Sequence, residues 1–320
     1  MKKRAIRVAV VMIALGLCLA AAALCTVKFD FSRLVKAELT TETVSVTETF
    51  DRVEIDVSDA DVTISAGSLC QVTYQKDEGE TFEIAAEGGV LRIKQGSEVP
   101  WYRNLFRLRK RMPVTVQLPA GEYAALRVKS RSGDILVGES LSFAEADLTA
   151  SSGNVTWNGG AGRLSAVTTS GNVRVFGMRG GAAMEELSLV STSGNVRVMG
   201  IDAGALDVTT TSGDAELQSV TCADADVQTT SGEAELDNVA ASGVLRVTTT
   251  SGDIELEYCD GGELFLQSVS GDIDGGLRTP KLFDVKTTSG EVEIPPMRTG
   301  AEAICHAVTT SGDIELEIGD

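Results

Sequence analysis

A chain of 320 residues could form two ordinary domains, but only 5% of its residues are aromatic and 33 are glycine. This composition supplies little bulk for a large globular core and suits a narrow interior filled by Val, Ile, Leu and Ala. The formal net charge is −18, divided into +1 over residues 1–112 and −19 over residues 113–320. An acidic body repels nucleic acid and anionic lipid, so nucleic-acid binding is disfavoured and cations or basic peptides are the expected ligands.

The chain begins with a basic tail at residues 1–7, followed by an uncharged stretch at residues 8–27 that is long enough to cross a bilayer as a helix. The flanking positive charges predict a cytoplasmic N-terminus, and hence a single-pass cell-membrane protein with an extracytoplasmic body. Two alternatives stay open. Small residues at 20–23 could serve a signal peptidase, which would leave a secreted protein, and Cys25 could carry a lipoprotein modification.

Residues 28–48 contain few strong signals and are interpreted as a juxtamembrane tether. From about Phe50, apolar and polar residues alternate over short runs, which is typical of half-buried strands. We therefore expect residues 49–120 to form irregular N-terminal rungs of a longer repeat structure. Within them, residues 58–64 look like a degenerate copy of the later repeat without its glycine.

A basic, aromatic insertion at residues 96–112 interrupts this strand pattern. One reading is an amphipathic lip that contacts the membrane or a cell-wall polymer. The other is a solvated hairpin, or a short helix that packs its own aromatic rings inward. The candidate membrane or wall contacts are Trp101, Tyr102, Arg103, Phe106, Arg107, Arg109, Lys110 and Arg111.

Residues 121–320 contain a Ser-Gly step that returns every 18 to 23 residues, usually followed by Asp or Asn. Positions −7, −5, +2 and +4 from each repeat glycine are apolar, so each repeat reads as two strands joined at Ser-Gly, with one side buried. Stacking each unit on the next predicts an all-β fold, a parallel β-solenoid (β-helix) of about ten 19–20-residue rungs, preceded by one N-terminal transmembrane helix. We expect the glycine to allow a turn conformation closed to other residues.

The outward positions +1 and +3 change along the repeat, from Asn and Arg in early rungs to paired acids in the last six. In one reading, the residue after Gly bonds turn backbone groups and the Glu column keeps an exposed sheet soluble. In the other, the acids form a face for cations or basic ligands. Calcium is the metal that such a face could bind, because hard cations take oxygen ligands, and no other cofactor is expected. The twelve candidate residues are Asp214, Glu216, Glu233, Glu235, Asp253, Glu255, Asp272, Asp274, Glu291, Glu293, Asp313 and Glu315.

No constellation of residues indicates catalysis. His306, the only histidine, lies at an outward position without an evident nucleophile partner. The acids recur in register, whereas a catalytic pair should differ locally from its neighbours. The sequence therefore predicts a protein that is not an enzyme, with a polysaccharide-active β-helix enzyme as a less favoured alternative. Cys259 and Cys305 occupy apolar repeat positions and are expected to be small core residues.

The step Leu118-Pro119-Ala120-Gly121 before the first clear rung, together with rungs that read Thr-Ser-Gly-Asp or Thr-Ser-Gly-Asn, resembles the DUF4097 family, also called the "putative adhesin" family. The resemblance covers roughly residues 50–320. It implies a bacterial cell-envelope β-solenoid, often membrane-anchored and in some cases encoded with systems that sense envelope stress. It supplies no catalytic residues.

We therefore expect a non-enzymatic binding or scaffold module of the cell envelope, linked to adhesion or to the envelope-stress response. A cell-wall polymer or an envelope protein is the expected partner, besides the membrane itself. The alternative is a purely structural stalk or an oligomerising rod, which exposed terminal rungs would favour.

Overall fold

The computed structural model describes residues 40–76, 80–97, 112–177, 182–296 and 303–319, together with the single residue Gly16. Most of the predicted transmembrane segment and tether, and the eight candidate contacts of the basic insertion, lie outside these residues. In the part of the chain that is described, no helix is long and apolar enough to cross a membrane.

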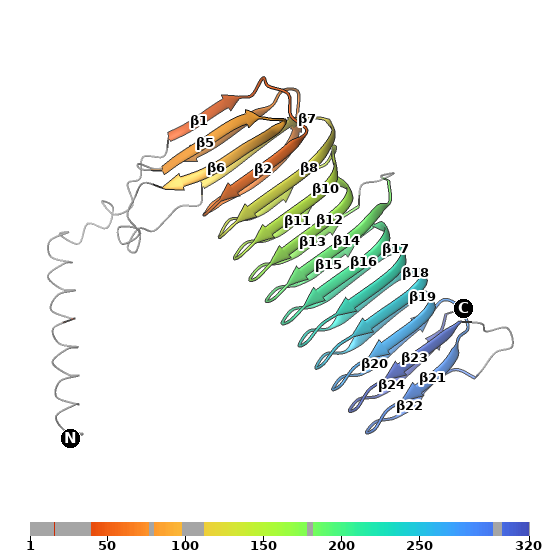
Figure 1. Ribbon diagram of the computed structural model, residues 1–320. Helices are drawn as coiled ribbons and strands as arrows, with labels where there is room; N and C mark the ends of the chain where they lie inside the picture. Colours follow the sequence, from red (N-terminus) through yellow and green to blue (C-terminus); the bar gives the residue numbers. More distant parts are fainter. Residues whose placement is uncertain are drawn as a thin grey trace.

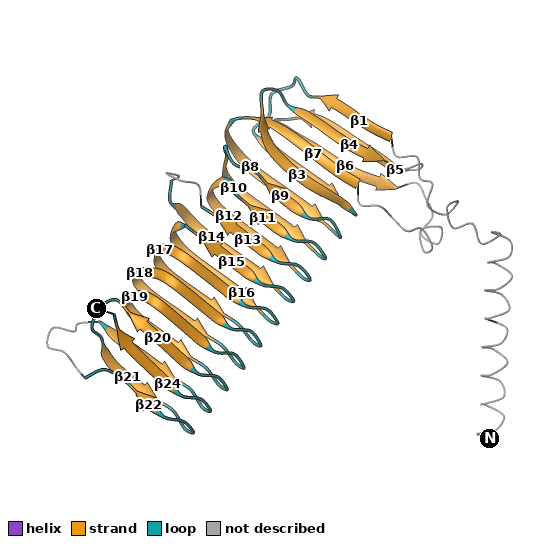
Figure 2. Cartoon of the chain, turned by 180° about the vertical axis from the view of Figure 1, so that it is seen from behind, coloured by secondary structure: helices purple, strands orange, loops and turns teal. Residues whose placement is uncertain are grey.

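From residue 40 onward the described chain is all β, a parallel β-solenoid of about nine turns. It forms a straight rod (Figure 1) whose Ser-Gly turns follow one another along one edge (Figure 2). We call the strand that enters a Ser-Gly turn the leading strand and the one that leaves it the trailing strand. Each pairs in parallel with its equivalent in the neighbouring rungs, so a leading sheet and a trailing sheet enclose the interior.

Most rungs have two separate strands. The leading strands are β8 (Gly121–Ser130), β10 (Leu141–Ala150), β12 (Gly160–Thr168), β14 (Met184–Ser191), β16 (Asp202–Thr210), β21 (Leu282–Lys286) and β23 (Ile304–Val308). The trailing strands are β9 (Ile135–Val137), β11 (Val155–Trp157), β13 (Val173–Phe176), β15 (Val196–Met199), β20 (Ile273–Leu277), β22 (Val292–Glu293) and β24 (Ile314–Ile318). In three places the trailing strand of one rung and the leading strand of the next rung form one continuous strand. These strands are β17 (Ala215–Gln228), β18 (Ala234–Thr248) and β19 (Ile254–Gln267).

The N-terminal rungs are not stacked in chain order. β2 (Arg52–Val57) and β3 (Ala60–Gly67) form a rung in which Ala60 takes the place of the repeat glycine. β6 (Val90–Ser97) and β7 (Met112–Pro119) form the rung outside it. β2 lies between β6 and β8, and β3 lies between β7 and β9, so the earliest rung in the sequence is the second in space.

Three antiparallel strands cover this end of the rod. β5 (Glu80–Glu87) pairs with β6, β4 (Gln71–Lys76) pairs with β7, and β1 (Thr40–Ser45) pairs with β4. The prediction of a tether up to residue 48 is therefore wrong for β1. Glu42 holds this strand in place, because it accepts a hydrogen bond from the Tyr74 hydroxyl at 2.6 Å and lies 2.7 Å from Lys76 Nζ.

The C-terminal rungs are also out of chain order, contrary to the expectation that each unit stacks on the next. β23 pairs with β19 on one side and with β21 on the other, and β24 lies in the same way between β20 and β22. The last rung of the sequence, around Gly312, is thus inserted before the rung around Gly290, which becomes the end of the rod (Figure 1).

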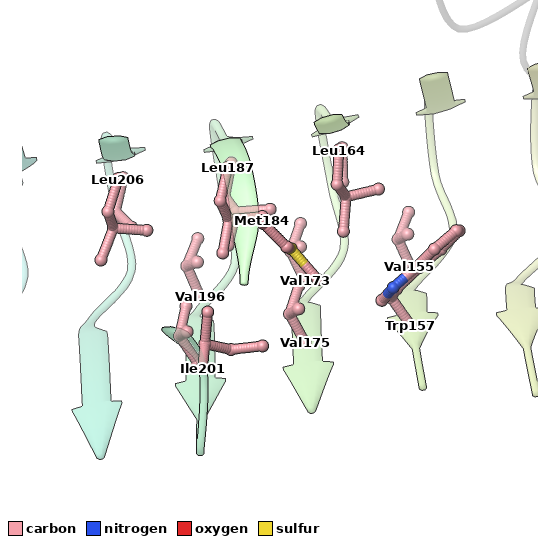
Figure 3. Packing of buried hydrophobic residues seen from close by; sticks show 14 of the residues in the cluster. Val155, Trp157, Leu164, Val173, Val175, Met184, Leu187, Val196, Ile201 and Leu206 are labelled. Carbon is pink, nitrogen blue, oxygen red and sulfur yellow. The ribbon is translucent and has the colours of Figure 1, made fainter. Parts of the chain in front are cut away.

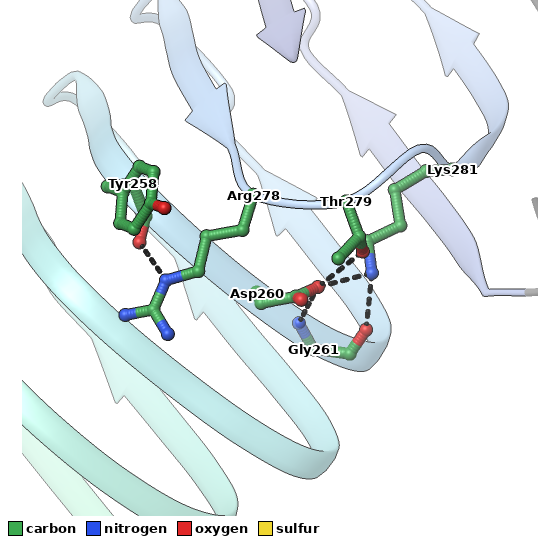
Figure 4. A network of polar contacts seen from close by, with 6 residues as sticks. All are labelled: Tyr258, Asp260, Gly261, Arg278, Thr279 and Lys281. Carbon is green, nitrogen blue, oxygen red and sulfur yellow. Dashed lines mark hydrogen bonds and ion pairs between the residues drawn. The ribbon is translucent and has the colours of Figure 1, made fainter. Parts of the chain in front are cut away.

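A polar cluster fixes the connection that makes this insertion possible (Figure 4). Lys281 is 2% exposed; its Nζ pairs with Asp260 and donates to the Gly261 carbonyl at 2.8 Å. Arg278 Nε donates to the Tyr258 carbonyl at 2.7 Å. These contacts hold residues 278–281 against β19, so that β21 begins one rung further out and leaves a space for β23.

The interior contains the apolar residues that the repeat predicted. Leu164, Leu187 and Leu206 from successive leading strands lie along the core, next to the trailing-strand valines (Figure 3). Cys259 and Cys305 are buried, as predicted, and burial raises their thiol pKa values to about 11 and about 12. The N-terminal half also holds an aromatic stack that the sequence did not reveal. From the N-terminal end of the rod toward its middle, the stacked rings are those of Phe50, Tyr123, Phe143 and Trp157.

Candidate functional site

The repeat glycines are required by the close approach of neighbouring rungs. A Cβ added at any of the ten would lie only 1.8–2.2 Å from a carbonyl oxygen of the adjacent rung, as at Gly213 below Gly194. Among the described glycines, positive φ angles occur only at Gly88, Gly89 and Gly200. The expectation that the repeat glycine serves a special turn conformation is therefore wrong, and its role is to leave room for the next backbone.

The hydroxyl at position −3 binds the same carbonyl groups. Thr168 Oγ1 donates to the Gly153 carbonyl at 3.0 Å, and Ser191 Oγ donates to the Gly171 carbonyl at 2.9 Å. The same bond recurs at Thr210, Thr249, Ser268, Thr287 and Thr309. Each of these hydroxyls ties its own rung to the carbonyl of a neighbour.

The residue at +1 forms a second ladder between rungs. An Oδ1 atom of Asp or Asn accepts the backbone N–H of the +1 residue in the next rung, over distances of 2.7–3.2 Å. The ladder follows spatial order, running from Asp272 to Asp313 and then to Glu291. The four +1 aspartates among the candidates thus bond backbone groups, as the first reading of this column proposed.

Glu233 interrupts this ladder. Its longer side chain replaces the Asp or Asn found at the other internal +1 positions, and it faces Glu255 instead of the next backbone N–H. Burial, a hydrogen bond to Glu255 and repulsion from Glu255, Asp253 and Asp214 raise the pKa of Glu233 to about 6. This carboxyl therefore holds a proton more tightly than an isolated glutamate.

The +3 acids form a continuous column on the outer surface of the trailing sheet. In the parallel register of successive rungs, Glu216 lies beside Glu235, Glu235 beside Glu255, and Glu255 beside Asp274. The column continues through Glu315 to Glu293 at the end of the rod. Glu216, at its inner end, is 3.2 Å from Arg197, and this is the only ion pair of the column among the described residues.

A shallow groove of about 190 Å³ runs beside the middle of this column. Asp237 and Glu257, two positions further along the trailing strands, form its second wall, and Gly275 also lines it. Five carboxylates line it: Glu235, Asp237, Glu255, Glu257 and Asp274. Burial, and then repulsion from Asp272, Glu315, Glu255 and Asp253, raises the pKa of Asp274. An arrangement of this kind favours bound positive charge.

Sequence reasoning identified the +3 acids but missed the second wall of the groove. Asp237 and Glu257 stand at +5, which has no acidic consensus along the repeat, because the same position holds Gln218 and Gly276 in other rungs. The twelve candidates therefore divide into six +1 residues, mostly used by the ladder, and six +3 residues that face solvent. Among the residues described, no group of three or more His, Cys, Asp and Glu side chains is arranged to hold a metal ion.

His306 lies on the opposite, leading sheet, away from this groove. Its ring stacks on Phe265 with centroids 5.0 Å apart, and its Nδ1 is 3.0 Å from Asp284. Arg246 covers the other side of the Phe265 ring at 4.6 Å. These contacts join the inserted rung to the rung on each side of it, so the surface position predicted for His306 has a structural use.

The chain is similar to one protein family and, more distantly, to several solved structures. The Toastrack DUF4097 family matches residues 50–317. No curated protein matches the chain. Among solved structures, the chain is 17% identical to a "putative lipid binding protein" of Parabacteroides distasonis ATCC 8503, with a TM-score of 0.47 and coverage of 88% of this chain and 98% of that one. It is 15% identical to a "putative adhesin" of Parabacteroides merdae ATCC 43184, with a TM-score of 0.45 and the same coverage.

Proposed function

This chain belongs to the Toastrack DUF4097 family, and on that premise we propose that it is a non-catalytic binding module whose +3 acidic column receives a basic peptide segment. The observation that carries the proposal is the unbroken run of carboxylates from Glu216 to Glu293, which among the described residues has a cation partner only at its inner end. Rungs repeat about every 4.8 Å, so the column offers evenly spaced negative charges to a ligand that carries several positive ones.

The +1 residues support binding only indirectly. One carboxylate oxygen of Asp253 and one of Asp272 accept a backbone N–H of the next rung, which keeps the neighbouring rungs in register. The +3 side chains make no such bond, so a ligand can pair with them without weakening the stack. The groove beside Glu235 and Glu255 gives an extended chain a place to lie.

Three substitutions test this proposal: Glu235→Gln, Glu255→Gln and Asp274→Asn in one variant. We expect the dissociation constant for a fluorescent lysine decapeptide to rise roughly tenfold, since each exposed ion pair contributes about 0.2–1 kcal/mol. Binding by the wild type should weaken as salt is added, because screening shortens the range of these charges.

A matched control removes the same charge elsewhere, through Glu122→Gln, Glu139→Gln and Glu145→Gln. This variant should bind like the wild type. Equal weakening in both variants would mean that only net charge matters, and a wild type that ignores the peptide at low salt would leave the stalk alternative standing. Calcium added in place of the peptide decides between a metal and a peptide ligand, because a metal site would raise the thermal midpoint of the wild type and not of the first variant.

We also propose that residues 8–27 anchor the solenoid outside the cell membrane, with the basic stretch 101–111 as a second contact surface for the membrane or the cell wall. The charge pattern of the N-terminal tail supports this placement. Protease added to intact cells should then digest the solenoid, and N-terminal sequencing of the membrane-bound protein should begin at or near Met1. A soluble product that starts after residue 20 would indicate signal cleavage instead.

A further inference from the structure

The end of the rod at the Gly290 rung is unusually apolar. Nine large hydrophobic side chains are exposed among the described residues, and five of them belong to the last two rungs in space. These five are Leu282, Val292, Ile294, Ile304 and Val308. Apolar side chains concentrated at one place on an otherwise acidic surface indicate a contact site.

The two ends of the rod differ in how they are finished (Figure 1). At the N-terminal end, antiparallel β5 and β4 cover both strands of the terminal rung. At the other end, β21 pairs with β23 and β22 pairs with β24, and no further described strand covers either one. The fold thus already shows that antiparallel strands can close a terminal rung, and among the described strands it has them at the N-terminal end only.

The outer edge of β21 offers backbone groups for such a strand. The Leu282 N–H donates to the Ala303 carbonyl at 2.8 Å, and the Lys286 carbonyl accepts from Thr309 at 3.0 Å, so these residues point their backbone groups at β23. Because successive residues of a strand alternate in direction, Phe283 and Val285 present their N–H and C=O groups at the opposite edge. An edge of this kind is a template for another strand.

The neighbouring edge of β22 is protected against the same pairing. Glu291 and Glu293 place negative charge along it, and Pro295 and Pro296 follow directly. Charged residues and prolines are common means of blocking strand addition. Pairing at this end is therefore directed to β21.

We propose that β21 pairs with β21 of a second copy of this chain, antiparallel about a two-fold axis through Val285. Only registers that keep inward residues opposite inward residues are compatible with the buried side. Centring the pair on Asp284 would oppose two aspartates, and centring it on Lys286 would oppose two lysines. Centring it on Phe283 would only set Asp284 opposite Leu282. Centring it on Val285 places Asp284 of each copy opposite Lys286 of the other, so charge favours this register.

The groups needed for this pairing are accessible. Lys286 is exposed and its side chain has no ion-pair partner among the described residues. The Asp284 side chain, although bonded to His306, is 77% exposed. In the chosen register the two copies of Val285 lie opposite each other. The outward N–H of each would then donate to the outward C=O of the other, as in a hydrogen-bonded antiparallel pair. Phe283 and Val285, half-buried in the single chain, would be covered by the partner. The product is a rod of double length with its N-terminal ends facing outward.

Light scattering coupled to size exclusion tests this on the full-length chain in a mild detergent, over a micromolar range of protein concentration. We expect a dimer for the wild type. Lys286→Asp places aspartates opposite each other twice per dimer and should weaken the dimer at least about tenfold. The double variant Asp284→Lys with Lys286→Asp restores opposite charges and should restore the dimer. Lys129→Asp, in the equivalent column near the N-terminal end, is the matched control and should leave the dimer intact.

Val285→Pro provides a second test, because the one backbone N–H that it removes points to the outer edge. It should also yield monomers, while its thermal midpoint reports whether the fold survives. A wild type that stays monomeric overturns the proposal. So does a Lys286→Asp variant with unchanged mass, or a charge-swapped variant that fails to regain the dimer.

Discussion

In the phrase Thr-Thr-Ser-Gly-Asp, the first Thr, the Gly and the Asp each meet a neighbouring rung in a different way. At residues 210–214, the hydroxyl of the first Thr donates to a carbonyl, the Asp carboxylate accepts an N–H, and the glycine leaves room for the next backbone. The insistence of the phrase along the chain therefore reflects stacking, and each position has its own sensitivity to substitution.

Gly213→Ala should destabilise the protein by about 1–3 kcal/mol, because its Cβ would lie 2.2 Å from the Gly194 carbonyl oxygen and the rungs would have to separate. Gly121→Ala is the control, since a Cβ there has nothing within 4 Å. Chemical denaturation of the two variants measures the difference. Equal stability would show that the stack tolerates a methyl group at the turn.

Glu233→Asn should stabilise the protein by about 1 kcal/mol, because the new side chain can accept a hydrogen bond from the next rung. The Asn oxygen would accept the Asp253 N–H, as Asn172 accepts that of Asn195. The expected result is a higher thermal midpoint. Asn172→Ala, which removes a hydrogen bond of the same kind, should lower the thermal midpoint. If both variants have the thermal midpoint of the wild type, the ladder contributes nothing to stability.

The raised pKa of Glu233 also predicts a pH dependence. Because the folded protein binds this proton more tightly than the unfolded chain, the stabilising effect of protonation is complete below pH 4.5 and is lost as the pH rises through about 6. Glu233→Gln should therefore raise the thermal midpoint above pH 6 and change it little below pH 4.5. A gain that does not vary with pH would point to packing as its cause.

At the scale of elements, both ends of the solenoid are closed by inserting a rung out of chain order. β2 and β3 come first in the sequence but lie inside the β6–β7 rung, and β23 and β24 come last but lie inside the β21–β22 rung. At the C-terminal end, the buried Lys281 cluster holds the connection that skips one rung (Figure 4).

Lys281→Ala should destabilise the protein by about 3 kcal/mol, because it leaves Asp260 without its cation in a partly buried site. Hydrogen exchange should show lost protection mainly in β21 to β24. Lys94→Ala, at an exposed lysine of β6, is the control and should change stability by less than about 0.5 kcal/mol. Uniform loss of protection along the rod would argue that the cluster is not a local anchor.

The regular rungs could be predicted because period and apolar spacing specify them together. The order of the terminal rungs could not, since every rung carries nearly the same pairing surface and spacing alone does not select a neighbour. One signal was nevertheless present: Pro295 and Pro296 belong at a sheet edge, which marks the Gly290 rung as the last in space. The groove was harder to foresee, because Asp237 and Glu257 follow no repeat consensus.

At the scale of the whole molecule, charge is divided along the rod and between its two sheets. The trailing sheet concentrates acids toward the C-terminal end, whereas Arg92, Lys94, Arg127 and Lys129 surround Glu54 and Asp56 on the leading sheet near the other end. Like charges about 5 Å apart repel by roughly 0.8 kcal/mol even at the dielectric of water. The acidic column is thus a cost to folding in the absence of a ligand.

Added salt should therefore stabilise the protein, since the screening length falls from about 10 Å at 0.1 M to about 3 Å at 1 M. The thermal midpoint should rise with sodium chloride, and the variant with Glu235→Gln, Glu255→Gln and Asp274→Asn should start higher and rise less. The variant at Glu122, Glu139 and Glu145 should respond like the wild type. A midpoint that falls with salt would show that attractive pairs outweigh the column.

The inserted C-terminal rung has a consequence for how the protein is made. Residues 282–293 leave the ribosome before residues 304–318, yet their pairing partners among the described strands lie in that later segment. A chain that lacks residues 304–318 loses the inserted rung and also leaves the β21–β22 rung without support. This end of the rod can therefore close only after residues 304–318 have been made, which places its completion late in synthesis.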